Sequence, residues 1–331
     1  MTVMNPEGLS TLLERMDLIA AGEAFRSVEL HGGISSDIWL VHRGEGSFVV
    51  KRAREQLRVS SDWRAPIDRG ASEAAWLRYV AVVAPGYSPR VLAVDEESFA
   101  IALEYFDTLK YRNWKEDLLA GRVDENFAWH LGDVLGRIHA ASTITPGLAE
   151  RFANQELFES LRIEPYLLSA ADEVPEASTA LEAVIEGLRG PGRALVHGDL
   201  SPKNILIGER PVILDAECAT WGDPAFDAAF LLSHLAIKEI HLPYSAGPLR
   251  QSAVAFESAY LAAVEWEEPG EIGSRISRIL PALVLARVAG ASQVEYLSEE
   301  ERAYLRRSAI VALNSNRRLQ DVIDQRDGTA Q

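Results

Sequence analysis

A polar segment between two apolar runs constrains the fold of this chain more than any other part of its sequence. The segment VHGDLSPKNILIGERPVILDAE covers residues 196–217 and has the pattern H-x-D-L-x-x-x-N, an apolar hairpin and then D-x-E. Short apolar runs at residues 205–207 and 212–214 predict two strands joined by a turn. Such a hairpin returns the chain, so we expect Asp215 to lie near Asn204.

Phosphoryl transfer needs the groups that this segment supplies. One aspartate aligns the acceptor hydroxyl and takes its proton, while further oxygen ligands hold Mg²⁺ against the phosphates of a nucleotide. Asp199 suits the first role, and Asn204 and Asp215 suit the second, because hard oxygen ligands favour Mg²⁺ over zinc. The alternative is that Asp199 and Asn204 only cap turns. The joint spacing favours the phosphotransferase interpretation.

The two parts of the chain differ in their hydrophobic patterns. A helix is predicted over residues 6–21, and the rest of residues 1–106 alternates in the manner of strands around one main helix. Residues 107–331 show mostly helical spacing, and Ser298 with Glu301 forms a capping box before a long helix. We therefore predict an α+β chain with a strand-rich N-terminal lobe and a mainly helical C-terminal lobe.

Composition limits the partners and the location that we expect. The formal net charge of −16 argues against a nucleic-acid partner, because phosphate contacts need a basic face. Cys218 is the only cysteine, which excludes an intrachain disulfide and fits a reducing cytoplasm. The N-terminus, MTVMNPEGLS, lacks the pattern of a signal peptide. The longest apolar run contains His234 and is too short to span a bilayer, so we expect no membrane partner.

The segment HGDLSPKN, together with the later Asp215, resembles the aminoglycoside phosphotransferase and choline kinase family, which has a bilobal protein-kinase-like fold. The resemblance implies ATP and Mg²⁺ as cofactors. It implies catalytic roles for Asp199 and for His197, which would brace the loop. Glu217, in DAECATWGDPAFD, is implied as a second metal ligand by a resemblance to the D-x-E of 5-methylthioribose kinases. Asp227, in GDPAFDAAFLL, matches an aspartate that holds the backbone of the catalytic loop. The alternative for Asp227 is an acid in the first turn of a helix.

The same resemblance implies a Lys–Glu pair in residues 1–106, the lobe that it assigns to the nucleotide. Lys51, in FVVKRA, stands where the family has its phosphate-binding lysine. Glu73, in ASEAAWL, begins the following helix and can pair with it, which would fix the ammonium against the α- and β-phosphates. The alternative is an ordinary surface ion pair.

Two further segments would contact the nucleotide by this resemblance. The turn LHGGISSDIWLV, with Gly33 and Ser35, would cover the phosphates, although it departs from the pattern G-x-G-x-x-G. The segment LEYF, with Glu104 and Tyr105, would connect the lobes and bind the adenine through its backbone. The alternative for LEYF is the end of a core strand. The sequence leaves the choice between ATP and GTP open.

A second resemblance, to 5-methylthioribose kinases, extends over nearly the whole chain. It rests on LRVSSDWRAPIDRGASEAAWL, LRIEPYLLSA and LVLARVAGASQVEYLSEEERAYLRRSAIVAL, and it implies that Trp63, Arg287 and Arg112 lie on the substrate side. Trp63 is alternatively a core or interface aromatic, and Arg287 a structural ion pair. That family usually has H-G-D-L-H-T-G-S, whereas this chain has Ser201 to Asn204 as SPKN, which leaves a neighbouring substrate open.

These patterns together predict an ATP-dependent kinase for a small molecule with a hydroxyl group, such as 5-methylthioribose or a related sugar or nucleoside. The alternative is an aminoglycoside O-phosphotransferase, for which the acidic charge would suit a polycationic substrate. A protein kinase is disfavoured, because Asp215 and Asp227 leave little room for an activation loop and no A-P-E follows. A homodimer is left open.

Overall fold

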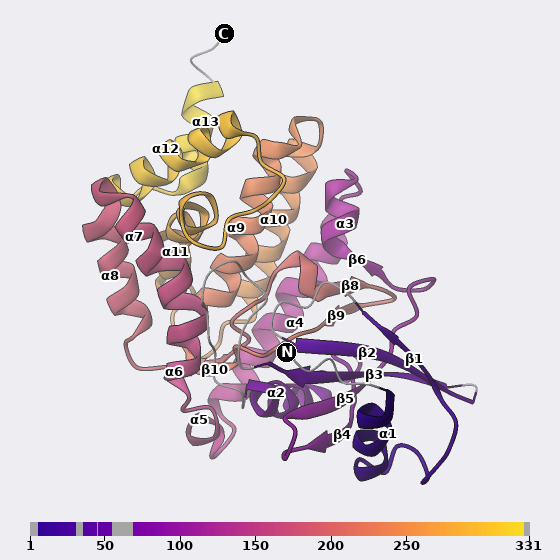
Figure 1. Ribbon diagram of the computed structural model, residues 1–331. Helices are drawn as coiled ribbons and strands as arrows, with labels where there is room; N and C mark the ends of the chain where they lie inside the picture. The colour runs from indigo at the N-terminus through magenta and orange to yellow at the C-terminus, as the bar shows by residue number, and fades with distance from the viewer. Residues whose placement is uncertain (1–5, 31–35, 45, 55–68, 328–331) are drawn as a thin grey trace. The chain divides into compact units, whose positions relative to one another are not determined.

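The computed structural model describes residues 6–30, 36–44, 46–54 and 69–327. The chain divides into two compact units, Met1–Lys110 and Tyr111–Gln331 (Figure 1). The first unit contains a five-stranded sheet and the second contains most of the helices. The predicted α+β class, with strands concentrated in the N-terminal part and helices in the C-terminal part, is confirmed.

The first unit is built on an antiparallel sheet with the strand order β1-β2-β3-β5-β4. Its elements are α1 (Pro6–Arg15), β1 (Arg26–Glu29), β2 (Ser36–Arg43), β3 (Gly46–Ala53), α2 (Arg69–Val83), β4 (Val91–Asp95) and β5 (Ala100–Glu104). Side chains alternate between the faces of a strand, so Val50 and Lys51 of β3 lie on opposite faces. Val50 packs in the cluster formed with Leu9 and Leu13 of α1. Lys51 faces α2 on the other side.

The first helix is shorter than the sequence predicts. We expected a helix over residues 6–21, whereas α1 ends at Arg15. Asp17 has a φ of 55°, in the left-handed region that ends a helix, and the backbone N–H of Leu18 donates to the carbonyl of Leu13. The apolar residues after Arg15 still pack in the core although they are not helical. Met16 and Ile19 are buried in the same cluster as Val50.

The second unit is mainly helical and contains two small sheets. The strand order is β6-β8-β9 in one and β10-β7 in the other, with antiparallel pairing throughout. Its elements are β6 (Arg112–Asn113), α3 (Trp114–Leu119), α4 (Glu125–Thr143), α5 (Leu148–Arg151), α6 (Gln155–Phe158), the π-helix η1 (Glu159–Leu168), α7 (Ser169–Glu173), η2 (Pro175–Ala177), α8 (Ser178–Leu188), β7 (Ala194–Val196), η3 (Pro202–Asn204), β8 (Ile205–Ile207), β9 (Pro211–Ile213), β10 (Thr220–Gly222), α9 (Ala225–His241), η4 (Pro243–Ser245), α10 (Ala246–Ala262), α11 (Pro269–Ala289), α12 (Glu299–Ser315) and α13 (Leu319–Asp327).

Close packing of α4 against α10 forms part of the core of this unit. Two glycines of α4 make it possible, because a Cβ at Gly132 would lie 2.3 Å from the carbonyl oxygen of Phe256 and one at Gly136 would lie 2.5 Å from Cβ of Ala263.

The predicted capping box is present at the start of α12, since the Ser298 side chain accepts from the Glu301 backbone. None of the helices in the described residues is long and apolar enough to cross a membrane.

Candidate active site

The candidate site begins with a sharp turn directly after β7. Gly198 has a φ of 78°, a conformation that residues with a side chain rarely adopt. A Cβ at this position would lie 2.6 Å from the carbonyl oxygen of Cys218, so the close approach of the two chain segments also requires glycine. The turn places His197 and Asp199 on either side of Gly198, at the end of the small β7–β10 sheet.

Asp227, in the first turn of α9, holds this turn by its backbone. Its Oδ2 accepts from the backbone N–H of His197 at 2.6 Å, and its Oδ1 accepts from that of Gly198 at 2.8 Å. The carboxylate is fully buried, and the Nε2 of His139 lies 3.3 Å from its Oδ2. A buried carboxylate needs such donors, because burial without hydrogen bonds is costly. The loop conformation and the Asp227 carboxylate therefore stabilise each other.

The ring of His197 links the loop to the hairpin that follows it. Its Nδ1 accepts from the backbone N–H of Asp199 at 3.1 Å, so the proton lies on Nε2, which donates to the carbonyl of Leu214 at 3.0 Å. Burial lowers the pKa of His197, against the attraction of Asp227 and other nearby carboxylates. A neutral, buried imidazole whose two nitrogens both bind the backbone positions the chain and does not act as a general acid or base.

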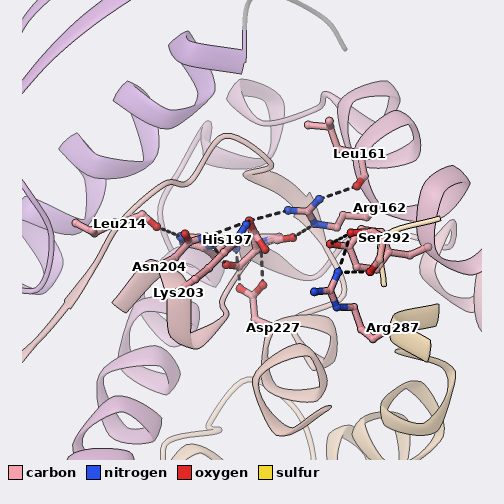
Figure 2. A network of polar contacts seen from close by, with 12 residues as sticks. Leu161, Arg162, His197, Lys203, Asn204, Leu214, Asp227, Arg287 and Ser292 are labelled. Atoms are coloured by element: carbon pink, nitrogen blue, oxygen red, sulfur yellow. Dashed lines mark hydrogen bonds and ion pairs between the residues drawn. The ribbon is translucent and has the colours of Figure 1, made fainter. Parts of the chain in front are cut away.

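The carboxylate of Asp199 is surrounded by cations and an amide. Its Oδ2 lies 3.1 Å from Nη2 of Arg162, 3.1 Å from Nζ of Lys203 and 3.0 Å from Nδ2 of Asn204 (Figure 2). Burial would raise the pKa of Asp199, but Arg162 and Lys203 outweigh it and hold that pKa below its usual value. Among the described residues, Oδ1 has no hydrogen-bond partner, so it is the oxygen available to a ligand.

Sequence reasoning missed Arg162. This residue lies in the π-helix η1, and its guanidinium also donates to the carbonyl oxygens of Gly198 and, at 2.6 Å, Leu161. The side chain is buried against the ring of Phe230, at 5.7 Å from the ring centre. The one sequence signal was an arginine inside the apolar stretch LRIEPYLL, because an arginine in such a stretch needs an acidic partner once it is buried.

The oxygen ligands predicted for a metal lie on the hairpin side of the loop. Carboxylate oxygens of Asp215 and Glu217 approach within 4.8 Å of each other. Asp215 has a φ of 66°, which aspartate tolerates better than most residues. The Nδ2 of Asn204 donates to Asp199, which leaves its Oδ1 as a hard acceptor, and its backbone carbonyl accepts from Leu214 at 2.8 Å. The hairpin thus brings Asn204 close to Asp215, as its sequence predicts.

The Lys51–Glu73 pair forms in the first unit. Nζ of Lys51 lies 2.7 Å from Oε2 and 2.8 Å from Oε1 of Glu73, and both side chains are buried. The alternative of a surface ion pair is therefore excluded by the burial. At the end of β5, Glu104 accepts from the side chain of Arg90 at 3.2 Å, and Tyr105 is half-buried after it.

The remaining candidates lie at different places. Arg112 pairs with Asp117 at 3.0 Å, and its own side chain is 58% exposed. Arg287 is partly buried and donates to Oγ of Ser292 at 2.7 Å. The structural ion pair that we considered for Arg287 is absent from the described part of the chain. Three candidates lie outside the described residues, namely Gly33, Ser35 and Trp63.

Comparisons with known proteins match this chain to a family of enzymes. The model of the phosphotransferase enzyme family matches residues 27–272. A methylthioribose kinase from Bacillus cereus is 24% identical over an alignment of 239 residues, and the match covers 64% of this chain and 60% of that protein. The match to this curated relative therefore spans about three fifths of the relative's length.

Solved structures resemble the chain over nearly its whole length. An ethanolamine kinase from Plasmodium vivax matches with a TM-score of 0.60 and 14% identity, over 94% of this chain and 90% of that chain. A spectinomycin phosphotransferase, crystallised with ADP and spectinomycin, matches with a TM-score of 0.52 and 12% identity, over 94% of this chain and 98% of that chain. At these identities the likeness establishes the fold, and the predicted bilobal kinase-like fold is confirmed.

Proposed function

This chain belongs to the phosphotransferase enzyme family, and on that premise we propose that it transfers the γ-phosphate of ATP to a hydroxyl group of a small molecule. The observation that carries the proposal is the setting of Asp199. Its buried carboxylate lies in a loop that Asp227 holds by two backbone N–H groups, and one oxygen remains available. A group fixed in this way can align an acceptor without further rearrangement.

In the proposed step the acceptor oxygen forms a bond to the γ-phosphorus while the bond to the bridging oxygen breaks and ADP leaves. Oδ1 of Asp199 orients the hydroxyl and takes its proton. Because Arg162 and Lys203 lower the pKa of Asp199, the carboxylate is ionised at neutral pH and accepts the proton late. This timing suits phosphoryl transfer, in which the transition state is loose and little base strength is needed. His197 is a positioning residue in this step.

The chemistry of the donor set fits Mg²⁺. Asp215 and Glu217 supply carboxylates, and Asn204 keeps one amide oxygen free of its contact with Asp199. Hard oxygen ligands of this kind are those that Mg²⁺ prefers. Bound there, Mg²⁺ would neutralise charge on the transferring phosphoryl group. The presence of ADP in the spectinomycin phosphotransferase structure supports an adenine nucleotide as the donor.

We assign the nucleotide to the N-terminal lobe, residues 1–106, and catalysis and acceptor binding to residues 107–331. The buried pair of Lys51 and Glu73 would present an ammonium group to the α- and β-phosphates. The backbone at Glu104 and Tyr105 would bind the adenine. Gly33 and Ser35 would cover the phosphates and Trp63 would close over nucleotide or sugar, and all three proposals rest on sequence resemblance alone.

For the acceptor we propose a sugar or nucleoside of the class to which methylthioribose belongs. The support is the match to a methylthioribose kinase, which acts on such a substrate by its name. An aminoglycoside is the second candidate, supported by the structural match to a spectinomycin phosphotransferase and by the acidic net charge. On the substrate side we place Arg287, and Arg112 with less support, because its guanidinium is already paired with Asp117. A cytoplasmic location, where ATP is available, is part of the same proposal.

A screen for acceptor-dependent formation of ADP tests the function. We would supply ATP and Mg²⁺ with sugars, nucleosides, choline-like alcohols and aminoglycosides in parallel, using Asp199→Asn as the matched control. The expected result is ADP formation that requires one acceptor class and is lost in the control. If the folded protein binds ATP but no member of the panel raises ADP formation above the Asp199→Asn level, the proposal is wrong.

A further inference from the structure

Among the described residues, two cationic side chains of the second unit have no acidic partner. In the described part of the chain, no carboxylate lies within 4.0 Å of Arg287 or Lys238. Arg287 donates from Nη1 to Ser292, while its Nε is buried and has no hydrogen-bond partner. Lys238 is 1% exposed, and its Nζ contacts the Tyr296 hydroxyl at 3.2 Å. Burying a cation without an anion is costly, so these two residues require an explanation.

Arg287 is linked to Asp199 through Tyr166 and Arg162. The guanidinium of Arg162, which pairs with Asp199, lies 5.3 Å from the centre of the Tyr166 ring, and that of Arg287 lies 5.6 Å from the same centre. Figure 2 shows Arg162 and Arg287 in one network of polar contacts. The guanidinium groups of Arg162 and Arg287 therefore both lie against the Tyr166 ring.

Lys238 reaches the same region along α9. Asp227, Phe230, His234 and Lys238 recur every three or four residues, so they lie on one face of this helix. The ring of Phe230 lies 5.8 Å from that of Tyr166 and 5.3 Å from that of His234. This face of α9 therefore continues from the catalytic loop, which Asp227 holds, past Tyr166 to Lys238. Helix α11, which carries Arg287, packs against α9.

The excess of positive charge affects the neighbouring titratable groups. Burial, Lys115 and Arg287 lower the pKa of Lys238 to about 7. Burial and the cations around it, Lys238 first, lower the pKa of His234 well below its usual value. Glu295 is the carboxylate of the described residues that opposes this effect at Lys238, and it already pairs with Lys115 at 2.5 Å. The contacts of the cations with the rings of Tyr166 and Tyr296 stabilise them less than burial of an unpaired charge costs.

We propose that the acceptor of this enzyme carries an anionic group, a carboxylate or a phosphate, which binds to Arg287 and Lys238 while its hydroxyl lies at Asp199. The inference rests on the proposed function and narrows its substrate class. It explains why a chain with a net charge of −16 keeps unpaired cations beside the candidate site. It also separates this chain from kinases of polycationic antibiotics, because a cation would be repelled by Arg287 and Lys238.

Matched hexoses that differ in charge test the inference by equilibrium binding. Glucose, glucosamine, glucuronate and glucose 6-phosphate would be titrated into the full-length protein by calorimetry, without nucleotide, at one ionic strength. We expect the two anionic sugars to bind at least 10-fold more tightly than glucose and glucosamine to bind least. The comparison of glucuronate with glucose 6-phosphate identifies a carboxylate or a phosphate as the preferred group. Equal affinities for glucose and both anionic sugars would overturn the inference.

Variants locate the anion. Arg287→Gln should weaken binding of the preferred anionic sugar 10- to 100-fold, the range expected for a charge-assisted hydrogen bond. Arg278→Gln is the matched control, because this arginine is exposed on the same helix. Lys51→Met shows whether a phosphate binds in the nucleotide lobe instead. Binding that is lost in Lys51→Met and kept in Arg287→Gln would overturn the inference. Lys238→Met, which removes a buried charge, provides a second variant in case Arg287→Gln does not fold.

The screen for ADP formation separates this inference from the proposed function. Anion binding that depends on Arg287, without transfer of phosphate to any acceptor, would support the site and refute the kinase activity. Transfer to neutral or cationic acceptors at a kcat/KM that Arg287→Gln leaves unchanged would refute the anionic substrate and leave the kinase activity in place. Transfer to an anionic acceptor with a KM raised at least 10-fold in Arg287→Gln would support both.

Discussion

The carboxylate of Asp227 accepts a hydrogen bond of 2.6 Å from the backbone N–H of His197, a residue 30 positions earlier in the chain. The second carboxylate oxygen accepts from the next residue, Gly198, at 2.8 Å. One side chain in the first turn of α9 therefore fixes two successive peptide groups of the candidate catalytic loop. The position of Asp199, which follows directly, depends on this contact.

Asp227→Asn should destabilise the fold and reduce activity together. An asparagine side chain presents one donor and one acceptor where two buried N–H groups need acceptors, so one of them loses its partner. We expect a loss of about 2–4 kcal/mol in the free energy of unfolding, measured by urea denaturation. Asp133→Asn is the matched control, because Asp133 forms a surface pair with Arg137. Equal stability of the two variants would show that Asp227 does not hold the loop.

Asp199→Asn should separate catalysis from nucleotide binding. The variant keeps the size of the side chain but cannot take the proton of the acceptor, so kcat should fall by roughly 10²–10⁴. ATP affinity should change little, because the proposed nucleotide contacts lie at other residues. We would measure ATP binding by calorimetry and turnover with the best acceptor. Turnover at the rate of the unmodified protein would mean that Asp199 only caps a turn.

Asp215→Asn is a cleaner test of the metal than Asp215→Ala. Asp215 has a φ of 66°, a region that asparagine adopts readily and alanine does not, so the asparagine variant avoids backbone strain. Loss of the negative charge should raise the Mg²⁺ concentration needed for half-maximal activity at least 10-fold, with an unchanged melting temperature in the absence of metal. An unchanged Mg²⁺ dependence would remove Asp215 from the metal ligands.

Lys51 and Glu73 should show strong coupling in stability. Both side chains are buried, so removal of either leaves the other charge unpaired. We expect Lys51→Met and Glu73→Gln each to cost about 2–4 kcal/mol of unfolding free energy, and the double variant to cost clearly less than their sum. The KM for ATP should rise in all three variants. Additive stability effects would contradict the buried pair.

The local pattern of the sequence predicted much of the candidate site. The hairpin after Asn204, the capping box at Ser298 and the pairing of Lys51 with Glu73 follow from residue spacing or from family resemblance. Helix α1 was predicted to be too long, because the apolar residues after Arg15 fit a helical stripe although Asp17 breaks the helix. A hydrophobic pattern indicates which residues are buried, not where a helix ends.

The partners of Asp199 could not be predicted from spacing. Arg162 lies 36 positions before Gly198, to which it donates, and its approach depends on the π-helix η1. The same holds for Lys238, which looks in sequence like a cation in the last turn of a helix, a common place for one. Its burial depends on how α9 packs against α11 and on the segment that carries Tyr296. Contacts between distant segments of this kind become visible only in the folded chain.

Lys238 should make the stability of the protein depend on pH. Its pKa is about 7 in the folded protein and 10.5 as a model value for an exposed lysine. Between these values the unfolded chain binds a proton that the folded chain does not, so this group makes stability rise with pH from about 7 to 10.5. Below pH 7 the full cost is present, because the folded protein must then carry the buried charge.

Lys238→Met removes this contribution and should change the pH profile. We expect the variant to be more stable than the unmodified protein at pH 6, by at most about 5 kcal/mol for a shift of this size, and the difference to vanish as pH approaches 10. Urea denaturation at several pH values, in buffers without phosphate or carboxylate, measures it. Lys110→Met, at an exposed lysine, is the control and should show no such trend. A constant difference between Lys238→Met and the unmodified protein from pH 6 to 10 would show that Lys238 keeps its ordinary pKa in the folded protein.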